Sequence, residues 1–390
     1  MKIPFKYTVR NLLTRRLTTG LTVIGIALVV FVFTAVLMMA EGVRKTLIST
    51  GSEENVMILR KSATAEITSI ISVEDVNIIK ALPHIAQRPD GKPIASGEGV
   101  VIVNLNYQKG KGFGNVTVRG VTPEGMTLRP QVKLVQGRMF QWGSREIVIG
   151  QSIYKRFEGV TLGEKIKYGG DLWTVVGVMD SDGSGFDSEI WGDVDQLSQA
   201  FGRLSAVSIV LLRLDNPGNF DDFKAALTKD IRLQYFDAKR EKQFYDEQSE
   251  DLAFFIRILG TVVTIIFSAG AMIGAMITMY AAVSNRTVDI GTLRALGFRR
   301  RNILWTFFVE SIFLALFGGA AGIVIASILQ FFSVSMINFT SFTELAFKFA
   351  ISPGIIFRSF VFAVVMGIFG GFLPAVRASR LNIVNALRST

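Results

Sequence analysis

The chain has 390 residues, 49% of them hydrophobic, and its mean hydropathy is +0.40, which predicts membrane-spanning segments rather than an ordinary soluble protein. The formal net charge is +10, there is no cysteine, and His84 is the only histidine. Disulfides, cysteine nucleophiles and histidine-rich metal sites are therefore excluded.

The N-terminal residues 1–16 predict an amphipathic helix on the inner membrane surface, because apolar residues recur there at helical spacing beside five cations. A solvated tail is the alternative. Residues 17–40 carry no charge and predict the first span. We expect an uncleaved span rather than a signal peptide, because its apolar core is too long and Met39-Ala40-Glu41-Gly42 lacks a small-x-small cleavage site.

Residues 41–256 predict a large α+β domain inserted after the first span. Its two ends, 41–50 and 239–256, are expected to be helices that form a stalk, either a lever or a simple tether. Ser72, three residues before Asp75, predicts a helix start of the capping-box type. Strands are expected at 99–106, 116–119, 146–150, 173–179 and 207–213, and helices at 73–82, 194–201 and 220–229.

Three further apolar runs predict spans at 257–285, 304–332 and 358–376. A segment at 286–303, an external loop at 333–357 and a tail at 377–390 separate or follow them. The fold class is therefore a polytopic α-helical membrane protein with four transmembrane helices and a large α+β extracytoplasmic domain between helices 1 and 2. Small-residue clusters at 270–274, 318–322 and 367–371 suit close helix packing, or reflect the general frequency of glycine in spans.

The distribution of charge predicts the orientation. The N-terminus, the 286–303 segment and the tail together carry thirteen cations and one acid, Asp289, whereas Glu41–Ile256 has 26 basic and 29 acidic residues. This is the positive-inside pattern, so both termini should be cytoplasmic and nucleic acid is not the expected partner. The phenylalanines of the outer loop are interpreted as interfacial anchors, with a path for a lipid-like substrate as the alternative. They are Phe331, Phe332, Phe339, Phe342, Phe347 and Phe349.

The segment 286–303 is the most informative part of the chain. It has a small apolar face among arginines, which suits a docking surface for another protein; a helix resting on the membrane is the alternative. Glu310 is the one acid within a span. We interpret it as a structural group neutralised by an arginine of the loop or tail, since no second intramembrane titratable group makes a proton relay.

Motifs for catalysis and nucleotide binding are missing from the sequence. No Gly-x4-Gly-Lys-Ser/Thr loop is present, and Gly150-Gln-Ser152 has only the first half of a nucleophile elbow. The acidic run Asp180–Glu189 resembles a calcium loop, but Trp191 stands where the template needs glutamate. A polar turn is the preferred interpretation of that run.

The layout resembles the permease family that includes the exporter MacB, the lipoprotein-releasing permeases and the division protein FtsX. The cytoplasmic segment follows the family pattern in Arg286, Asp289-Ile290-Gly291, Leu293, Ala295-Leu296-Gly297 and Arg300. The external domain is similar in Arg119-Gly120-Val121-Thr122-Pro123, Gly137-Arg138-Met139-Phe140 and Ser188-Glu189-Ile190-Trp191. One departure is Ile383-Val384, where members commonly have proline.

The resemblance implies a non-catalytic permease subunit of the inner membrane that binds no cofactor itself, with ATP and Mg on a separate cytoplasmic ABC ATPase. It implies a second permease copy, contact with membrane lipid, and leaves room for a periplasmic adaptor or substrate-binding protein. The 286–303 segment would be the coupling helix, moving the external domain to export a hydrophobic or amphiphilic cargo. The alternative is an FtsX-like signalling scaffold that activates an external enzyme. The expected coupling residues are Arg286, Ile290, Gly291, Leu293, Arg294, Leu296, Gly297 and Arg299.

Overall fold

The computed structural model describes residues 16–383 except residues 109 and 111. The amphipathic helix predicted at 1–16 lies, but for Arg16, outside the described residues, as does the tail after residue 383. The chain divides into two compact units. The helical unit comprises the residues up to Glu41, Phe254–Phe332 and those from Phe349 onward, and the α+β unit comprises Gly42–Ala253 and Ser333–Lys348.

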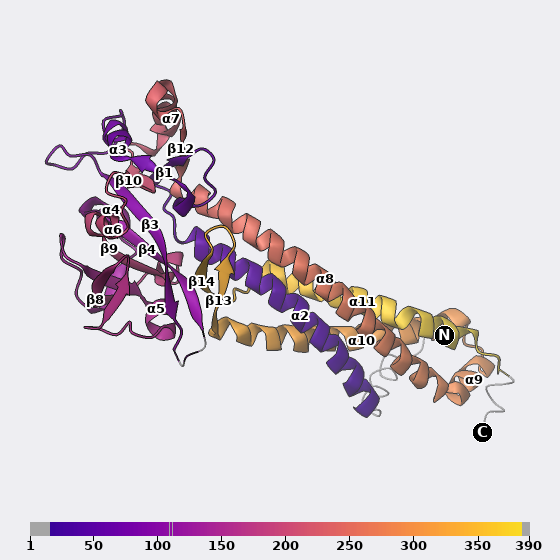
Figure 1. Ribbon diagram of the computed structural model, residues 1–390. Helices are drawn as coiled ribbons and strands as arrows, with labels where there is room; N and C mark the ends of the chain where they lie inside the picture. The colour runs from indigo at the N-terminus through magenta and orange to yellow at the C-terminus, as the bar shows by residue number, and fades with distance from the viewer. Residues whose placement is uncertain (1–15, 109, 111, 384–390) are drawn as a thin grey trace. The chain divides into compact units, whose positions relative to one another are not determined.

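Four helices of the described residues are long and apolar enough to cross a membrane, as predicted. They are α2 (Arg16–Ile48), α8 (Glu241–Ser284), α10 (Arg300–Ser327) and α11 (Pro353–Arg380), with the short α9 (Thr287–Ala295) between α8 and α10 (Figure 1). The α+β unit is inserted between the first and second of them, so the predicted fold class is confirmed. Both α2 and α8 contribute residues to each unit.

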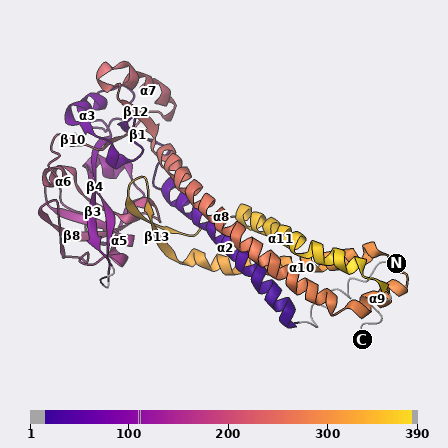
Figure 2. The same cartoon turned by 45° about the vertical axis from the view of Figure 1, so that its right-hand side comes forward.

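Each of these helices begins before its predicted span because hydrophobicity marks only the apolar centre, whereas α10 ends at Ser327, short of the predicted residue 332. For example, α11 starts at Pro353 rather than at 358, since the hydroxyl of Ser352 accepts a hydrogen bond from the Ile355 amide at 3.3 Å. The predicted stalk helices are the outer ends of α2 and α8. Within the α+β unit these ends lie side by side (Figure 2), and Arg44 Nε is 3.6 Å from Asp246 Oδ1.

Glycines allow close contact between several spans. A Cβ on Gly318 would lie 2.9 Å from Ile26 of α2, and one on Gly371 would lie 2.0 Å from the Ser311 hydroxyl oxygen of α10. The clusters at 318–322 and 367–371 therefore serve helix packing. By contrast, a Cβ on Gly270 or Gly274 would meet nothing within 4 Å among the described residues.

The α+β unit is built on one large mixed sheet. Its strands run in the order β12-β1-β11-β3-β4-β9-β6-β8-β5, and β7 also pairs with β8. Seven strands are in the first part of the chain: β1 (Asn55–Arg60), β3 (Ala95–Asn106), β4 (Phe113–Val121), β5 (Lys133–Gly137), β6 (Glu146–Gly150), β7 (Lys165–Tyr168) and β8 (Asp171–Asp180). The others are β9 (Glu189–Asp193), β11 (Ile209–Arg213) and β12 (Phe236–Arg240); β2 (Ile71–Ser72) and β10 (Ala206–Val207) form a separate pair.

Two apolar clusters cover the two ends of this sheet, and the long strand β3 contributes to both. One cluster includes Val101 of β3 and Trp173 of β8, and the other includes Ala95 of β3 and Phe223. The helices of the unit are α3 (Val73–Lys80), α4 (Pro123–Leu128), α5 (Gln151–Arg156), α6 (Val194–Ala200) and α7 (Phe220–Lys229), with short 3-10 turns between elements. The predicted cap of α3 is confirmed, because the Asp75 amide donates to the Ser72 hydroxyl at 3.1 Å.

Part of the predicted external loop 333–357 is instead a β-hairpin. Strands β13 (Ser333–Asn338) and β14 (Thr343–Lys348) pair antiparallel and belong to the α+β unit. Five of the six residues of β14 are buried, including Phe347, which is therefore a core residue and not an interfacial anchor. Phe339 and Phe342 at the hairpin turn are exposed.

Candidate functional site

The segment predicted to dock another protein begins with a buried ion pair. α8 ends at Ser284, and Arg286 in the following turn donates to Glu310 of α10 through both terminal nitrogens, at 3.0 and 3.1 Å. The two side chains are only 7% and 4% exposed, and the guanidinium lies over the Phe307 ring at 5.7 Å. Because an isolated charge would be costly there, each group depends on the other.

The predicted coupling helix 286–303 is shorter than expected. α9 ends at Ala295, and residues from Arg300 onward belong to α10. Gly297 has φ 95°, its amide donates to the Arg294 carbonyl at 3.2 Å, and the Phe298 amide donates to the Leu293 carbonyl at 3.2 Å. This pair of bonds is a Schellman cap, for which glycine is the favoured residue.

The inner face of α9 packs on its own helices. Ile290 is 2% exposed, in a cluster with Met279, Phe307 and Ala375, and Gly291 is also buried. Of the expected coupling residues, Ile290 and Gly291 therefore contact the chain's own helices, and Arg286 is engaged in the buried ion pair with Glu310. α9 has only nine residues, so the spacing of its apolar residues could not predict which of its faces packs against α10.

The outer face keeps the other predicted residues. Leu296 is 68% exposed, and Arg299, three residues later, is also exposed. Leu293 is half-buried. Arg294 is also half-buried, and its guanidinium lies 3.4 Å from the Ser379 carbonyl of α11. With Arg300 and Arg301 also exposed, this end of the helical unit presents an apolar residue among cations. We call the residues Leu296, Arg299, Arg300 and Arg301 the basic elbow.

A second constellation, missed by sequence reasoning as a site, is a network of buried charges in the α+β unit. Arg119 of β4 is fully buried and donates to three carboxylates: to Glu189 and Glu66 at 2.8 Å, and to Glu98 at 3.1 Å. Arg129 pairs with Glu98 as well. An arginine inside an apolar strand requires such partners. The one charged residue in the apolar run Val116–Val121 was therefore the feature of the sequence that could have indicated this network.

The network extends to the first turn of α8. Glu241 is buried, lies 3.4 Å from Arg129 Nη2, and accepts hydrogen bonds from the Ser52 amide at 3.0 Å and the Asn55 side chain at 2.8 Å. Burial raises the pKa of Glu241, and Arg129 only partly opposes this. For Glu66 burial acts in the same direction, but the Arg119 guanidinium outweighs it and the pKa lies below its usual range.

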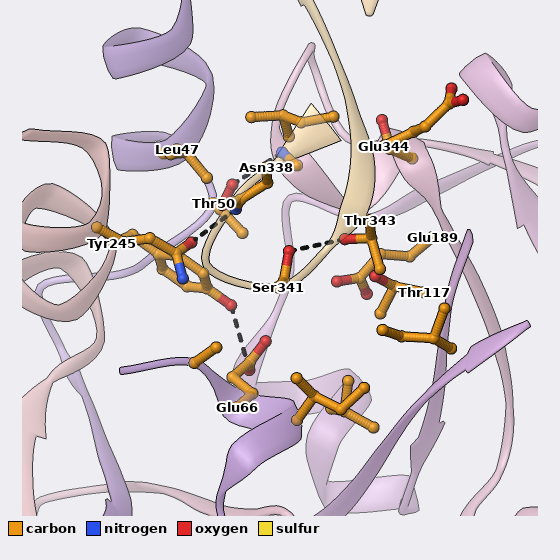
Figure 3. Close-up of a pocket in the computed structure, with 18 residues that line it drawn as sticks. Leu47, Thr50, Glu66, Thr117, Glu189, Tyr245, Asn338, Ser341, Thr343 and Glu344 are labelled. Carbon is orange, nitrogen blue, oxygen red and sulfur yellow. Dashed lines mark hydrogen bonds between the residues drawn. The ribbon is translucent and has the colours of Figure 1, made fainter. Parts of the chain in front are cut away.

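A polar cavity lies beside the network (Figure 3). Glu66 and Tyr245 form one wall, with the Tyr245 hydroxyl donating to Glu66 Oε1 at 3.3 Å. The hairpin residues Asn338, Ser341 and Thr343 form another. The hairpin is held there by an ion pair of Glu344 with Arg156, and by bonds from Asn115 to the Phe342 carbonyl at 2.8 Å and from the Ala346 amide to Ser188 Oγ at 2.9 Å.

The described residues contain no group of three or more His, Cys, Asp or Glu side chains that could hold a metal ion. In the run that resembles a calcium loop, the Asp187 carboxylate accepts bonds from the Ser181 amide and hydroxyl, both at 2.7 Å, and from the Gly183 amide at 3.0 Å. Its oxygens close the turn in which it lies.

Comparisons with known proteins cover both units. A model of the MacB-like periplasmic core domain matches residues 19–230, and a model of the FtsX-like permease C-terminal region matches residues 261–383. The macrolide export ATP-binding/permease protein MacB of Bdellovibrio bacteriovorus is 27% identical, over 97% of this chain and 60% of its own length. The pyoverdine export ATP-binding/permease protein PvdT of Pseudomonas entomophila is 28% identical, over 96% of this chain and 58% of its own. The chain thus spans about three fifths of the length of these curated relatives.

Solved structures match about half of the chain at lower identity. The periplasmic region of MacB from Actinobacillus actinomycetemcomitans matches 50% of this chain and 92% of its own, with 13% identity and a TM-score of 0.38. The extracellular domain of the noncanonic ABC-type transporter YknZ from Gram-positive bacteria matches 47% of this chain and 99% of its own, with 18% identity and a TM-score of 0.37.

Proposed function

Because the chain belongs to the family of ABC transporter permeases that carry a MacB-like periplasmic core domain and an FtsX-like permease region, we propose that it is the membrane subunit of an exporter driven by an ABC ATPase outside residues 1–390. The chain itself carries no catalytic group in this proposal. ATP and Mg act on the ATPase, and two permease copies assemble with two ATPase copies. Both termini are cytoplasmic, and the α+β unit is outside.

The observation that carries this proposal is the basic elbow. Leu296 is an apolar side chain exposed among Arg299, Arg300 and Arg301, at the end of a helix that is itself anchored in the helical unit by Arg286, Ile290 and Glu310. A docking residue transmits force only if the helix that carries it is held firmly in the rest of the protein. The buried ion pair and the Schellman cap at Gly297 supply that support.

Movement of the basic elbow would be transmitted to the α+β unit through elements that link the two units covalently. α8 is one helix that starts at Glu241, in the buried charge network, and ends at Ser284, next to Arg286. The β13–β14 hairpin supplies a second connection, because it follows α10 in sequence and folds as part of the α+β unit. In this proposal the cargo is hydrophobic or amphiphilic and is moved by the outer unit, with or without an adaptor, rather than through a charged path between the spans.

Docking at the elbow is tested by Leu296→Asp in the full chain, co-expressed with the ABC ATPase and purified in mild detergent. The matched control is Leu204→Asp in the α+β unit, since Leu204 is 70% exposed. We expect Leu296→Asp to reduce recovery of the ATPase at least tenfold, because it places a carboxylate in an apolar contact, while Leu204→Asp leaves recovery unchanged. Equal recovery with both variants would overturn the assignment of the elbow.

A further inference from the structure

A groove in the α+β unit lies at the seam between its two apolar clusters. Gly99 and Val101 of β3 line it, together with α6 and the segment that leads to β11. It encloses about 420 Å³ of empty space, including solvent at its mouth. Its apolar lining consists of Ile70, Val101, Leu197, Phe201, Ala206 and Val207.

The walls of this groove belong to different parts of the core. Leu197 is a member of the cluster around Trp173, and Phe201 packs against that cluster. Val207 packs against the other cluster, around Phe223. Ile70 remains 53% exposed at the groove. An apolar ligand here would cover Ile70 and the parts of Phe201, Ala206 and Val207 that the two clusters leave accessible.

The polar lining of the groove defines the charge that the ligand should carry. The Ser208 hydroxyl accepts from the Val100 amide at 3.0 Å, so it is already engaged. Arg203 is exposed, and the only hydrogen bond of its side chain among the described residues is a long one of 3.5 Å to the Val100 carbonyl. None of the described residues that line the groove is acidic. A cation next to an apolar slot matches an anionic head group joined to an alkyl chain.

We propose that this groove binds the alkyl chain of an anionic amphiphile, with Arg203 contacting its acidic head group. The inference rests on the proposed function, since it narrows the cargo class from hydrophobic or amphiphilic molecules to single-chain anionic ones. A neutral ligand would gain no charge-assisted contact from Arg203, and a cationic one would be repelled by it.

The experiment uses the full chain in lipid nanodiscs and a dodecanoic acid that carries a photoreactive diazirine near the end of its chain. After irradiation, labelled peptides are identified by mass spectrometry. We expect labelling of the peptides that contain Ile70 and residues 197–207, and competition by unlabelled dodecanoate. The matching diazirine alcohol, which lacks the charge, should label these peptides about tenfold less.

Two variants and a control separate specific binding from partition into lipid. Arg203→Glu should reduce labelling of the groove about tenfold, through loss of a charge-assisted contact. Ala206→Trp should abolish it by filling the space. Lys92→Glu, a charge reversal at an exposed residue that does not line the groove, should leave it unchanged.

The outcomes distinguish this inference from the proposed function. Labelling confined to the four long helices, or groove labelling that survives both variants, overturns the amphiphile site. If the groove is not labelled but the wild-type chain still recovers its ATPase, only the site is wrong. If the groove is labelled but no ATPase associates, the site stands as a binding site and the exporter proposal fails.

Discussion

The Glu310 carboxylate and the Arg286 guanidinium form a two-pronged ion pair, at 3.0 and 3.1 Å, that joins the turn after α8 to α10. The chain between the two residues includes α9 and the basic elbow. The pair therefore connects the two ends of the segment that we propose to dock on the ATPase. Its strength should set how firmly that segment is held.

Removing one partner of this pair should cost more than removing both. Glu310→Gln leaves a buried guanidinium without its counter-charge, and we expect a loss of about 3–5 kcal/mol in the free energy of unfolding. The double variant Glu310→Leu with Arg286→Met should recover most of that loss. Thermal unfolding in detergent measures both. Asp289→Asn, an exposed acid in the same segment, is the control and should change stability by less than about 0.5 kcal/mol.

The buried network makes the stability of the α+β unit depend on pH in two opposite ways. The pKa of Glu241 is raised by burial, so the folded unit binds a proton more readily than the unfolded chain does, and stability falls as pH rises from the usual glutamate value of 4.5 through the raised pKa. The pKa of Glu66 is lowered, so its contribution is present above pH 4.5 and is lost as pH falls below it.

Glu241→Gln should therefore stabilise the α+β unit above the raised pKa and have little effect at pH 4.5. Urea unfolding followed by the fluorescence of the buried Trp173 and Trp191 measures the difference at each pH. Glu250→Gln, at an exposed residue of the same helix, controls for the change of net charge. A variant less stable than wild type at every pH would mean that Arg129 needs the ionised carboxylate.

Gly297 should tolerate asparagine better than alanine. Its φ of 95° lies in the left-handed region, where a Cβ costs about 1 kcal/mol or more and asparagine is the next best residue. We expect Gly297→Ala to speed amide hydrogen exchange at residues 296–298 and to weaken ATPase recovery, and Gly297→Asn to restore both in part. If alanine and asparagine behave alike, the Schellman cap does not position the elbow.

The ion pair between Arg156 and Glu344 should hold the hairpin in the α+β unit. Glu344→Gln removes a charge from a largely buried pair, and we expect amide exchange in β13 and β14 to rise about fivefold, equivalent to about 1 kcal/mol. Arg138→Gln breaks the exposed pair with Glu146 and should leave exchange in the hairpin unchanged. Unchanged exchange in Glu344→Gln would show that the backbone contacts of the hairpin are sufficient.

The helical unit and much of the large sheet could be predicted because their signals are local. Uncharged runs mark the centres of the spans, α7 matches its predicted residues 220–229, and β6 matches 146–150. The hairpin could not be predicted in this way. Residues Thr343–Phe347 of β14 are buried on both faces, so the strand lacks the alternation that marks a half-exposed strand. Its one phenylalanine, Phe347, could be mistaken for an anchor at the membrane interface.

The candidate sites were predictable only in part, because their geometry depends on contacts distant in sequence. Leu296 and Arg299 are exposed, whereas Ile290 packs with residues of α8, α10 and α11 because tertiary packing selects the inner face of α9. Arg119 carried a signal as a charge in an apolar strand. Its carboxylate partners lie on separate elements, so the sequence alone could not bring them together.

Because it includes the β13–β14 hairpin, the α+β unit is formed from two segments of the chain that are far apart in sequence. Residues 42–253 leave the ribosome before α9 and α10 exist, whereas 333–348 follow both. Until then Ser188 lacks the amide of Ala346, and Arg156 lacks the carboxylate of Glu344. The outer unit can therefore complete its fold only after the third span has been synthesised, and a soluble fragment that stops at residue 253 would need the hairpin joined to it.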